Sequence, residues 1–226
     1  MFKSLINLFF PRVCSGCNSI LLTDEKVICT SCRHEIPLTN FHNNPNNEAF
    51  SKFYGKVPIE FAAALFFFQK KGIVQEMIHK LKYKGHEEIG STIGFWYAEE
   101  LKSLLQIKGI DFIIPVPLHP KKLRERGYNQ VTAFGKALSE GLAIPYNESI
   151  LVRKVYSKTQ TKKSLLKRSE LNTTVFDVVF DGALVGKHFL LIDDVITTGS
   201  TLEICSRALL KIPDAKVSIV CMAMTQ

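Results

Sequence analysis

Apolar residues gather in four short runs, which set the framework of the chain. The runs lie at residues 60–69, 111–117, 189–192 and 217–222. Continuous apolar runs of this length are typical of strands that are buried on both faces of a parallel sheet. A fifth, shorter strand is predicted at residues 151–154.

Between these runs, apolar residues recur at helical spacing. This spacing predicts helices at residues 73–81, 87–105, 128–142 and 200–210. Strands and helices therefore alternate along the chain, which predicts an α/β fold with a parallel sheet flanked by helices.

Composition narrows the class of protein. The 226 residues leave room for one medium domain and a small module, and a hydrophobic content of 46% can build a full core. The formal net charge of +8 suits a polyanionic ligand, nucleic acid or a solvated basic surface. We expect no membrane span and no signal peptide, because the apolar run at residues 5–10 is too short and lacks a cleavage site. A cytoplasmic location is therefore predicted.

Four cysteines near the N-terminus have metal-ligand spacing. Cys14, Cys17, Cys29 and Cys32 form C-x-x-C, eleven residues, C-x-x-C. This pattern predicts a tetrahedral Zn²⁺ site that is structural, because four thiolates leave no open position. Two disulfides are an alternative that the lack of a secretion signal makes weaker. Spacing alone also allows an iron–sulfur cluster.

Residues 40–55 shift in composition to Asn, Pro, Ser and Lys, which is typical of a linker. We therefore predict two parts. Residues 1–50 form the four-cysteine module and linker, and residues 51–226 form the α/β domain.

The run at residues 189–192 leads into a polar segment. Its residues are Asp193, Asp194, Val195, Ile196, Thr197, Thr198, Gly199, Ser200 and Thr201. Backbone N–H groups at the start of the next helix favour a phosphate, and the hydroxyls donate further hydrogen bonds. The two carboxylates can accept from vicinal ribose hydroxyls, so the segment suits a ribose 5-phosphate. Two acids after a strand also occur as a metal site or in a plain turn. The glycine patterns of P-loops and of Rossmann cofactor sites are absent from the sequence.

Two other segments are strongly basic. The first, at residues 118–130, carries His119, Lys121, Lys122, Arg124 and Arg126. It is either a solvated basic turn or a loop that faces a pyrophosphate, and its place after a strand favours the loop. The second, at residues 153–172, is either disordered or a mobile lid that closes over a polyphosphate.

These motifs carry a family resemblance. An apolar strand, two acids, two residues and T-T-G-x-T resemble the PRPP-binding signature of type I phosphoribosyltransferases. Together with the cysteine module, I-H-K-L-K-Y-K-G at residues 78–85 and P-V-P-L-H-P-K-K-L-R-E-R-G-Y-N-Q at residues 115–130, the chain resembles the ComF family of competence-associated proteins. Arg153, Thr159, Gln160 and Arg168 fit the same pattern, whereas Lys162 and Lys163 stand where the family often has glycine.

The resemblance implies a type I phosphoribosyltransferase-like domain with a zinc-ribbon-like module, and a cytoplasmic role in DNA uptake. Asp193 and Asp194 would take the ribose hydroxyls, directly or through Mg²⁺, and Arg168 would act with them in catalysis. Residues 197–201 would hold the 5-phosphate of PRPP, and Val195 and Ile196 would belong to the same PRPP-binding segment. The residues expected to face the pyrophosphate are His119, Lys122, Arg124, Arg126, Arg153 and Gln160. Expected partners are single-stranded DNA and competence or recombination proteins.

The acceptor of a phosphoribosyl group stays open. Related 6-oxopurine enzymes have an Asp where this chain has Thr197. The chain also ends soon after its last strand, so we expect the N-terminal region to supply any hood over the acceptor. The prediction is therefore a ComF-like protein that binds PRPP or a related ligand. The alternative is an active phosphoribosyltransferase of nucleotide metabolism with an unknown acceptor.

Overall fold

The computed structural model describes residues 11–154 and 175–226 of the chain. Its main sheet has four strands in the order β1-β6-β5-β2, and every neighbouring pair is parallel. These strands are β1 (Phe61–Phe68), β2 (Phe112–Pro115), β5 (His188–Ile196) and β6 (Lys216–Thr225). A separate antiparallel pair joins β3 (Leu151–Arg153) to β4 (Phe176–Val178). All five strands predicted from apolar runs are confirmed.

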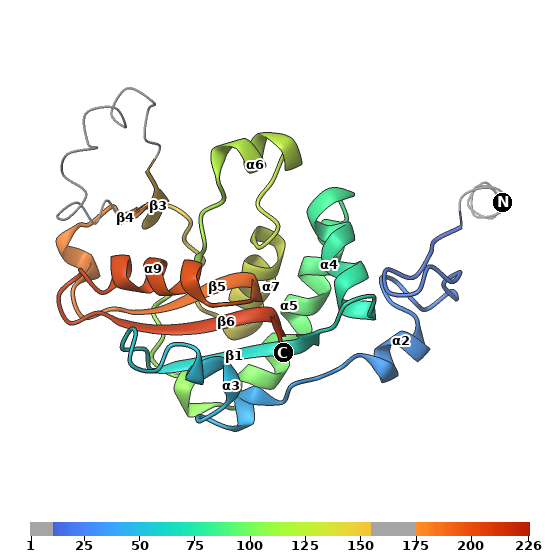
Figure 1. The fold of residues 1–226 in the computed structure, drawn as a ribbon, viewed down its shortest axis with the longest axis horizontal. Coiled ribbons are helices and arrows are strands. Elements are labelled where there is room, and N and C mark those ends of the chain that lie inside the picture. The colour runs from blue at the N-terminus through green and yellow to red at the C-terminus, as the bar shows by residue number, and fades with distance from the viewer. Residues whose placement is uncertain (1–10, 155–174) are drawn as a thin grey trace.

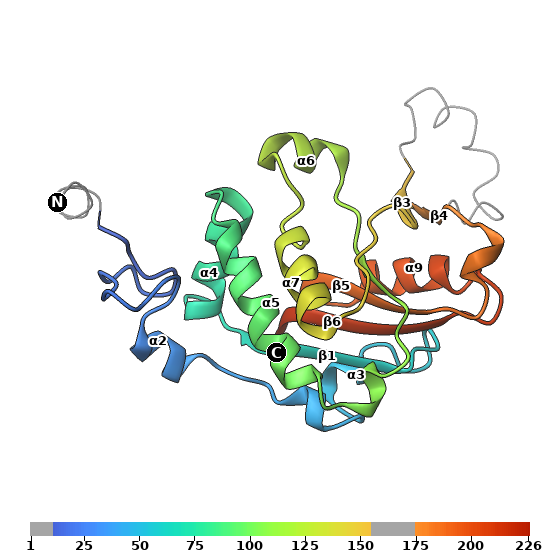
Figure 2. The ribbon, with the colours of Figure 1, turned by 180° about the vertical axis from the view of Figure 1, so that it is seen from behind.

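Helices cover both faces of the sheet (Figure 1; Figure 2). One face carries α4 (Ile73–Tyr83), α5 (Glu87–Leu101) and α7 (Thr132–Leu142), and the other carries α9 (Ser200–Leu209). Side chains of β5 alternate between the two layers. Leu190 and Ile192 pack with α4, α5 and α7, whereas Phe189 and Leu191 pack with α9, and all four are fully buried. The predicted α/β fold is confirmed.

The remaining elements are short. They are α2 (Thr30–Glu35), η1 (Phe41–Asn43), α3 (Glu48–Ser51), η2 (Leu105–Ile107), α6 (Pro120–Arg126) and η3 (Gly182–Leu184). Across residues 11–154 and 175–226, no helix combines the length and apolarity that crossing a membrane requires.

The segment with linker composition is folded against the sheet. The backbone N–H of Thr39 donates to the carbonyl of Leu65 in β1 at 3.0 Å. The side chain of Asn47 is 3% exposed, donates to the carbonyl of Ala62 at 2.8 Å and caps α3 through the N–H of Phe50 at 2.9 Å. Residues 40–55, whose composition is typical of a linker, therefore include a side chain, Asn47, that satisfies backbone groups of the domain. The division into two parts near residue 50 stays a prediction.

The first basic segment is a helix where a loop was expected. The ring of His119 accepts from the N–H of Lys121 at 3.1 Å, and Pro120 occupies the first helical position. Gly127 ends the helix with φ of 81°, in the left-handed region that glycine favours. Capping residues at both ends thus fold residues 120–126 into α6, and α7 begins only at Thr132.

Helices α5 and α7 approach each other closely because small residues face one another. A Cβ atom added at Gly94 would lie 2.6 Å from both the Cβ of Ala137 and the carbonyl oxygen of Phe134. One added at Gly141 would lie 2.4 Å from the Cβ of Ala98. The two backbones therefore have no room for a methyl group at these positions.

A Gly94→Ala substitution tests this contact. In an ordinary helix interior the change stabilises by about 0.5–1 kcal/mol. Here it should lower the free energy of unfolding by about 1–3 kcal/mol, because the new methyl group overpacks the interface. The matched control is Gly182→Ala, whose added Cβ meets no atom within 4 Å. Urea unfolding of both variants checks the sign, and a stabilised Gly94→Ala variant would contradict the close approach.

Candidate functional site

Side chains from seven segments line one cavity at the carboxyl edge of the sheet. Its volume is about 310 Å³. Strand β5 supplies two carboxylates, and α4, the loop after β2, α6, the loop between α6 and α7, β3 and α9 supply the rest. The lining residues are Lys82, Val116, Pro117, Leu118, His119, Lys122, Arg126, Gln130, Arg153, Asp193, Asp194 and Thr201. The cavity thus combines two carboxylates with several cationic groups.

Asp194 is held by donors from two different elements. Its side chain is buried, and its Oδ2 atom accepts from Lys82 Nζ at 3.0 Å and from Gln130 Nε2 at 2.6 Å. The oxygen of the Gln130 amide in turn accepts from Arg126 at 2.5 Å. An ion pair and a chain of hydrogen bonds therefore tie α4 and α6 to the end of β5.

Asp193 has a different environment from its neighbour. It is half-buried, and its Oδ1 atom accepts from the backbone N–H of Asp194 at 2.8 Å. Burial and then the charge of Asp194 raise the pKa of Asp193 to about 8, against smaller opposite effects of Lys82 and Lys122. The two adjacent carboxylates are thus unequal, because Asp194 is paired with a cation and Asp193 holds its proton more tightly.

The turn after β5 forms a second, smaller hollow of about 50 Å³. Its lining residues are Asp193, Val195, Thr197, Thr198, Gly199, Ser200, Thr201 and Leu202. Gly199 has φ of 79°, and a Cβ added there would lie 3.1 Å from the ring of Phe53. The hydroxyls of Thr198 and Ser200 lie 2.9 Å apart, and α9 begins at Ser200. Hydroxyls and free N–H groups at a helix start suit an anion of phosphate size.

Four basic side chains, here called the cationic wall, line the same cavity as the carboxylates. His119, Lys122 and Arg126 come from one side of α6, and Arg153 comes from the end of β3. The guanidinium group of Arg126 lies over the ring of Tyr83 at 5.0 Å, which fixes its position.

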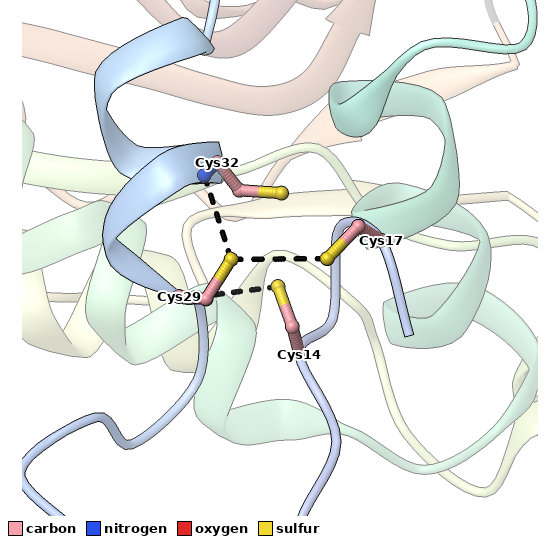
Figure 3. A group of neighbouring side chains, drawn as sticks. All are labelled: Cys14, Cys17, Cys29 and Cys32. Carbon is pink, nitrogen blue, oxygen red and sulfur yellow. Dashed lines mark hydrogen bonds between the residues drawn. The ribbon is translucent and has the colours of Figure 1, made fainter. Parts of the chain in front are cut away.

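The four cysteines form a second candidate site (Figure 3). Their Sγ atoms all lie within 4.8 Å of one another, and those of Cys17 and Cys29 are 3.7 Å apart. Zn–S bonds of about 2.3 Å in a tetrahedron require sulfurs about 3.8 Å apart. Backbone N–H groups of Gly16 and Cys29 donate to the sulfur of Cys14 at 3.3 and 3.2 Å. The cluster therefore fits a tetrahedral metal ion, and all six cysteines of the chain, which lie in the described ranges, are free of disulfides.

The cysteine module packs on α4 and α5 (Figure 1). Lys80 of α4 is 4% exposed, and its Nζ donates to the carbonyl of Cys14 at 3.1 Å and to Asn18 Oδ1 at 2.6 Å. The guanidinium group of Arg33 lies 3.5 Å from the ring centre of Trp96 in α5. A buried lysine thus joins the module to the helix that carries Lys82.

Comparison with known proteins gives relatives along most of the chain. No family model matches it. A DNA utilization protein, YhgH, of Shigella flexneri is 28% identical over 218 residues, which cover 94% of this chain and 90% of the relative. Competence protein F of Haemophilus influenzae is 31% identical over 147 residues, or 63% and 64% of the two chains. Competence protein ComFC of Bacillus subtilis is 28% identical over 139 residues, or 62% and 54%.

The resemblance to the ComF family is therefore confirmed by relatives named as competence proteins and by the four-cysteine cluster. Solved phosphoribosyltransferase structures overlap this chain in part. A purine phosphoribosyltransferase from Pyrococcus horikoshii has a TM-score of 0.38 and 22% identity, over 60% of this chain and 73% of that one. The glutamine PRPP amidotransferase of B. subtilis has a TM-score of 0.41 and 16% identity, over 63% and 30%. At these TM-scores the overlaps carry no argument about function.

Most predicted site residues lie at the cavity or the smaller hollow. Arg124 is exposed and is not among the lining residues, because it projects from the side of α6 opposite Lys122 and Arg126. The side chain of Ile196 is buried in the core, so only its backbone can face a ligand. Arg168, Gln160 and the rest of the predicted lid at residues 155–172 lie outside the described residues.

Lys82 and Gln130 were missed in the sequence. Both lie inside blocks that resemble the ComF family, I-H-K-L-K-Y-K-G and P-V-P-L-H-P-K-K-L-R-E-R-G-Y-N-Q. A lone lysine near a helix end and a lone glutamine have no spacing pattern of their own. Only the placement of α4 and of the loop between α6 and α7 beside β5 brings them to Asp194.

An Asp193→Asn substitution should stabilise the protein in a pH-dependent way. Because the folded protein binds the Asp193 proton more tightly than the unfolded chain does, the free energy of unfolding falls as pH rises from about 4 to about 8. Asn has no proton to lose, so the variant should gain about 1 kcal/mol or more at pH 8 and almost nothing at pH 4. Thermal unfolding across this range measures the difference.

Asp194→Asn is the control for that experiment. It removes the partner of Lys82, and we expect a loss of about 1–3 kcal/mol at pH 8. If Asp193→Asn raises and Asp194→Asn lowers the free energy of unfolding at pH 8, a general effect of lost charge is excluded. Changes in the free energy of unfolding in the same direction for both variants would contradict the unequal roles of the two carboxylates.

Proposed function

We propose that this ComF-like protein binds PRPP or a related ribose 5-phosphate ligand at the carboxyl edge of its sheet. One observation carries the proposal. A cavity lined by a pair of carboxylates and a cationic wall shares Asp193 and Thr201 with a neighbouring hollow of phosphate size. These three features match the diol, the 5-phosphate and the diphosphate of PRPP, because each group meets side chains of complementary chemistry.

The proposed orientation follows from the chemistry of each part. Asp193 and Asp194 accept from the ribose hydroxyls, and the turn at residues 197–201 donates to the 5-phosphate. The diphosphate faces the cationic side chains. These are His119, Lys122, Arg126 and Arg153. Arg168 and Gln160 are proposed to join them from the segment outside the described residues.

A role in DNA uptake is proposed from the relatives. Two of them are named competence proteins and others DNA utilization proteins. We extend that role to this chain, in the cytoplasm, with single-stranded DNA and competence or recombination proteins as partners. The formal net charge of +8 supports contact with a nucleic acid backbone.

An active phosphoribosyltransferase is the second candidate function. In such a reaction pyrophosphate leaves the anomeric carbon, and preorganised cations stabilise the departing charge. The cationic wall favours this function. No carboxylate stands at Thr197, which is exposed, so a base acceptor that needs a proton acceptor at this position is not supported.

We also propose that the cysteine cluster holds a structural Zn²⁺ ion. Four thiolates would complete its coordination and leave no position for a substrate. The ion would stabilise the module that packs on α4.

Cys32→Ser should remove this ion. Zinc content measured by mass spectrometry is expected to fall from one ion per chain to well below one, and the melting temperature should fall with it. The control is Cys205→Ser, which changes a buried thiol of α9 outside the cluster and should keep the zinc. A wild-type protein that carries no zinc after purification without chelators would contradict the proposal.

Calorimetric titration with PRPP tests the main proposal. Wild-type protein should bind with micromolar affinity, and Arg126→Gln should weaken binding about tenfold or more, because a charge-assisted hydrogen bond to phosphate is lost. An Asp193→Asn/Asp194→Asn double variant should lose binding. Lys136→Gln, an exposed change on α7, is the control for lost charge and should bind as the wild type does. Folded, zinc-loaded wild-type protein that fails to bind PRPP would overturn the proposal.

A further inference from the structure

We infer that the proposed site binds its ribose diphosphate without a divalent cation, because the ammonium group of Lys82 already occupies the place beside Asp194. The inference rests on the proposed function. It departs from the Mg²⁺ that the family resemblance implies, and it makes Lys82 a further ligand-binding residue.

The surroundings of Asp194 do not fit a magnesium ion. Mg²⁺ requires a near-octahedral set of oxygen ligands at about 2.0–2.1 Å. The Oδ2 atom of Asp194 instead accepts from two nitrogen donors, Lys82 Nζ at 3.0 Å and Gln130 Nε2 at 2.6 Å. A cation bound to that oxygen would stand directly against the ammonium group and would break both interactions.

The other side chains of the cavity offer few free oxygens. One oxygen of Asp193 accepts from the N–H of Asp194, and the amide oxygen of Gln130 accepts from Arg126. Among the described lining side chains, the other hydrogen-bonding groups are the Thr201 hydroxyl and nitrogen groups. The cavity is therefore built of donors to anionic oxygen and lacks the cage of oxygens that a hard cation prefers.

Lys82 is held in place through its neighbours in the last turn of α4. Lys80 donates to the cysteine module, and the carbonyl of Leu81 accepts from the hydroxyl of Tyr128. Tyr83 lies under the guanidinium group of Arg126. Because residues on both sides of Lys82 are tied to other elements, its ammonium group is positioned before a ligand arrives.

Lys82 can therefore do what a divalent cation would do. Its side chain is 21% exposed at the cavity, so the ammonium group can reach a ligand while it stays paired with Asp194. With Lys122, Arg126 and Arg153 it gives the cavity four cationic side chains against two carboxylates. This excess neutralises part of the diphosphate charge without a metal ion.

The experiment compares PRPP binding with and without magnesium. Protein and ligand are passed over a chelating resin that is then removed, because a soluble chelator would extract metal from the cysteine cluster. Calorimetry then measures the dissociation constant in this buffer and in the same buffer with millimolar MgCl₂. Wild-type protein should show values within about threefold of each other.

Lys82→Met supplies the second arm. Without magnesium the variant should bind PRPP at least about tenfold more weakly than the wild type. Magnesium should restore part of this loss, because the freed oxygen of Asp194 becomes available to a cation. A purely structural role for Lys82 would not create a magnesium dependence. Lys84→Met, an exposed change two residues along the chain, is the matched control and should behave as the wild type does.

Each outcome decides a different point. Wild-type binding that falls tenfold or more without magnesium overturns the inference and leaves the proposed function standing. A Lys82→Met variant that binds PRPP as the wild type does in both buffers also overturns it. If the folded wild-type protein binds no PRPP in either buffer, both the proposed function and the inference are contradicted.

Discussion

The position of strand β5 constrains the whole site. The strand pairs with β2 on one side and β6 on the other, and helices cover both of its faces. The two carboxylates in its C-terminal half, Asp193 and Asp194, therefore cannot move apart or retreat from the sheet. Two adjacent acids in such a place repel each other unless one is neutralised. The ion pair between Asp194 and Lys82 reduces this repulsion, and the raised pKa of Asp193 reduces it further because the carboxyl group keeps its proton to higher pH.

Helix α4 connects the two chemically distinct parts of the molecule. Its buried Lys80 bonds to the loop that carries Cys14, and Lys82, two residues later, bonds to Asp194. The cysteine module is thus no independent appendage, because it supports the helix that completes the cavity. Asn47, which precedes the predicted division near residue 50, also bonds to the carbonyl of Ala62 in β1.

Much of the fold could be predicted from the sequence because apolar runs and helical spacing record burial directly. The strands and long helices were found in this way, and the acidic pair, the hydroxyl turn and the cysteine spacing were visible as local patterns. Helix α6 was missed because its basic composition concealed the caps at His119 and Gly127. Lys82 and Gln130 were missed for a different reason. Their importance arises from contacts between elements far apart in the sequence, which no local pattern encodes.

The order of strands has a consequence for how the chain acquires its structure. Strand β6 lies between β1 and β5, so Phe61 has as its sheet partner Ser218. Strand β1 cannot pair with its sheet neighbour β6 until β6 is made, although β1 is made first on the ribosome. The apolar side chains of β1 lack this neighbour until the intervening chain has been synthesised. Strand pairings between segments so far apart in the sequence also form slowly. The segment around Thr39 and Asn47 bonds to β1 and precedes it in the chain, so it is available to cover that strand before β6 is made.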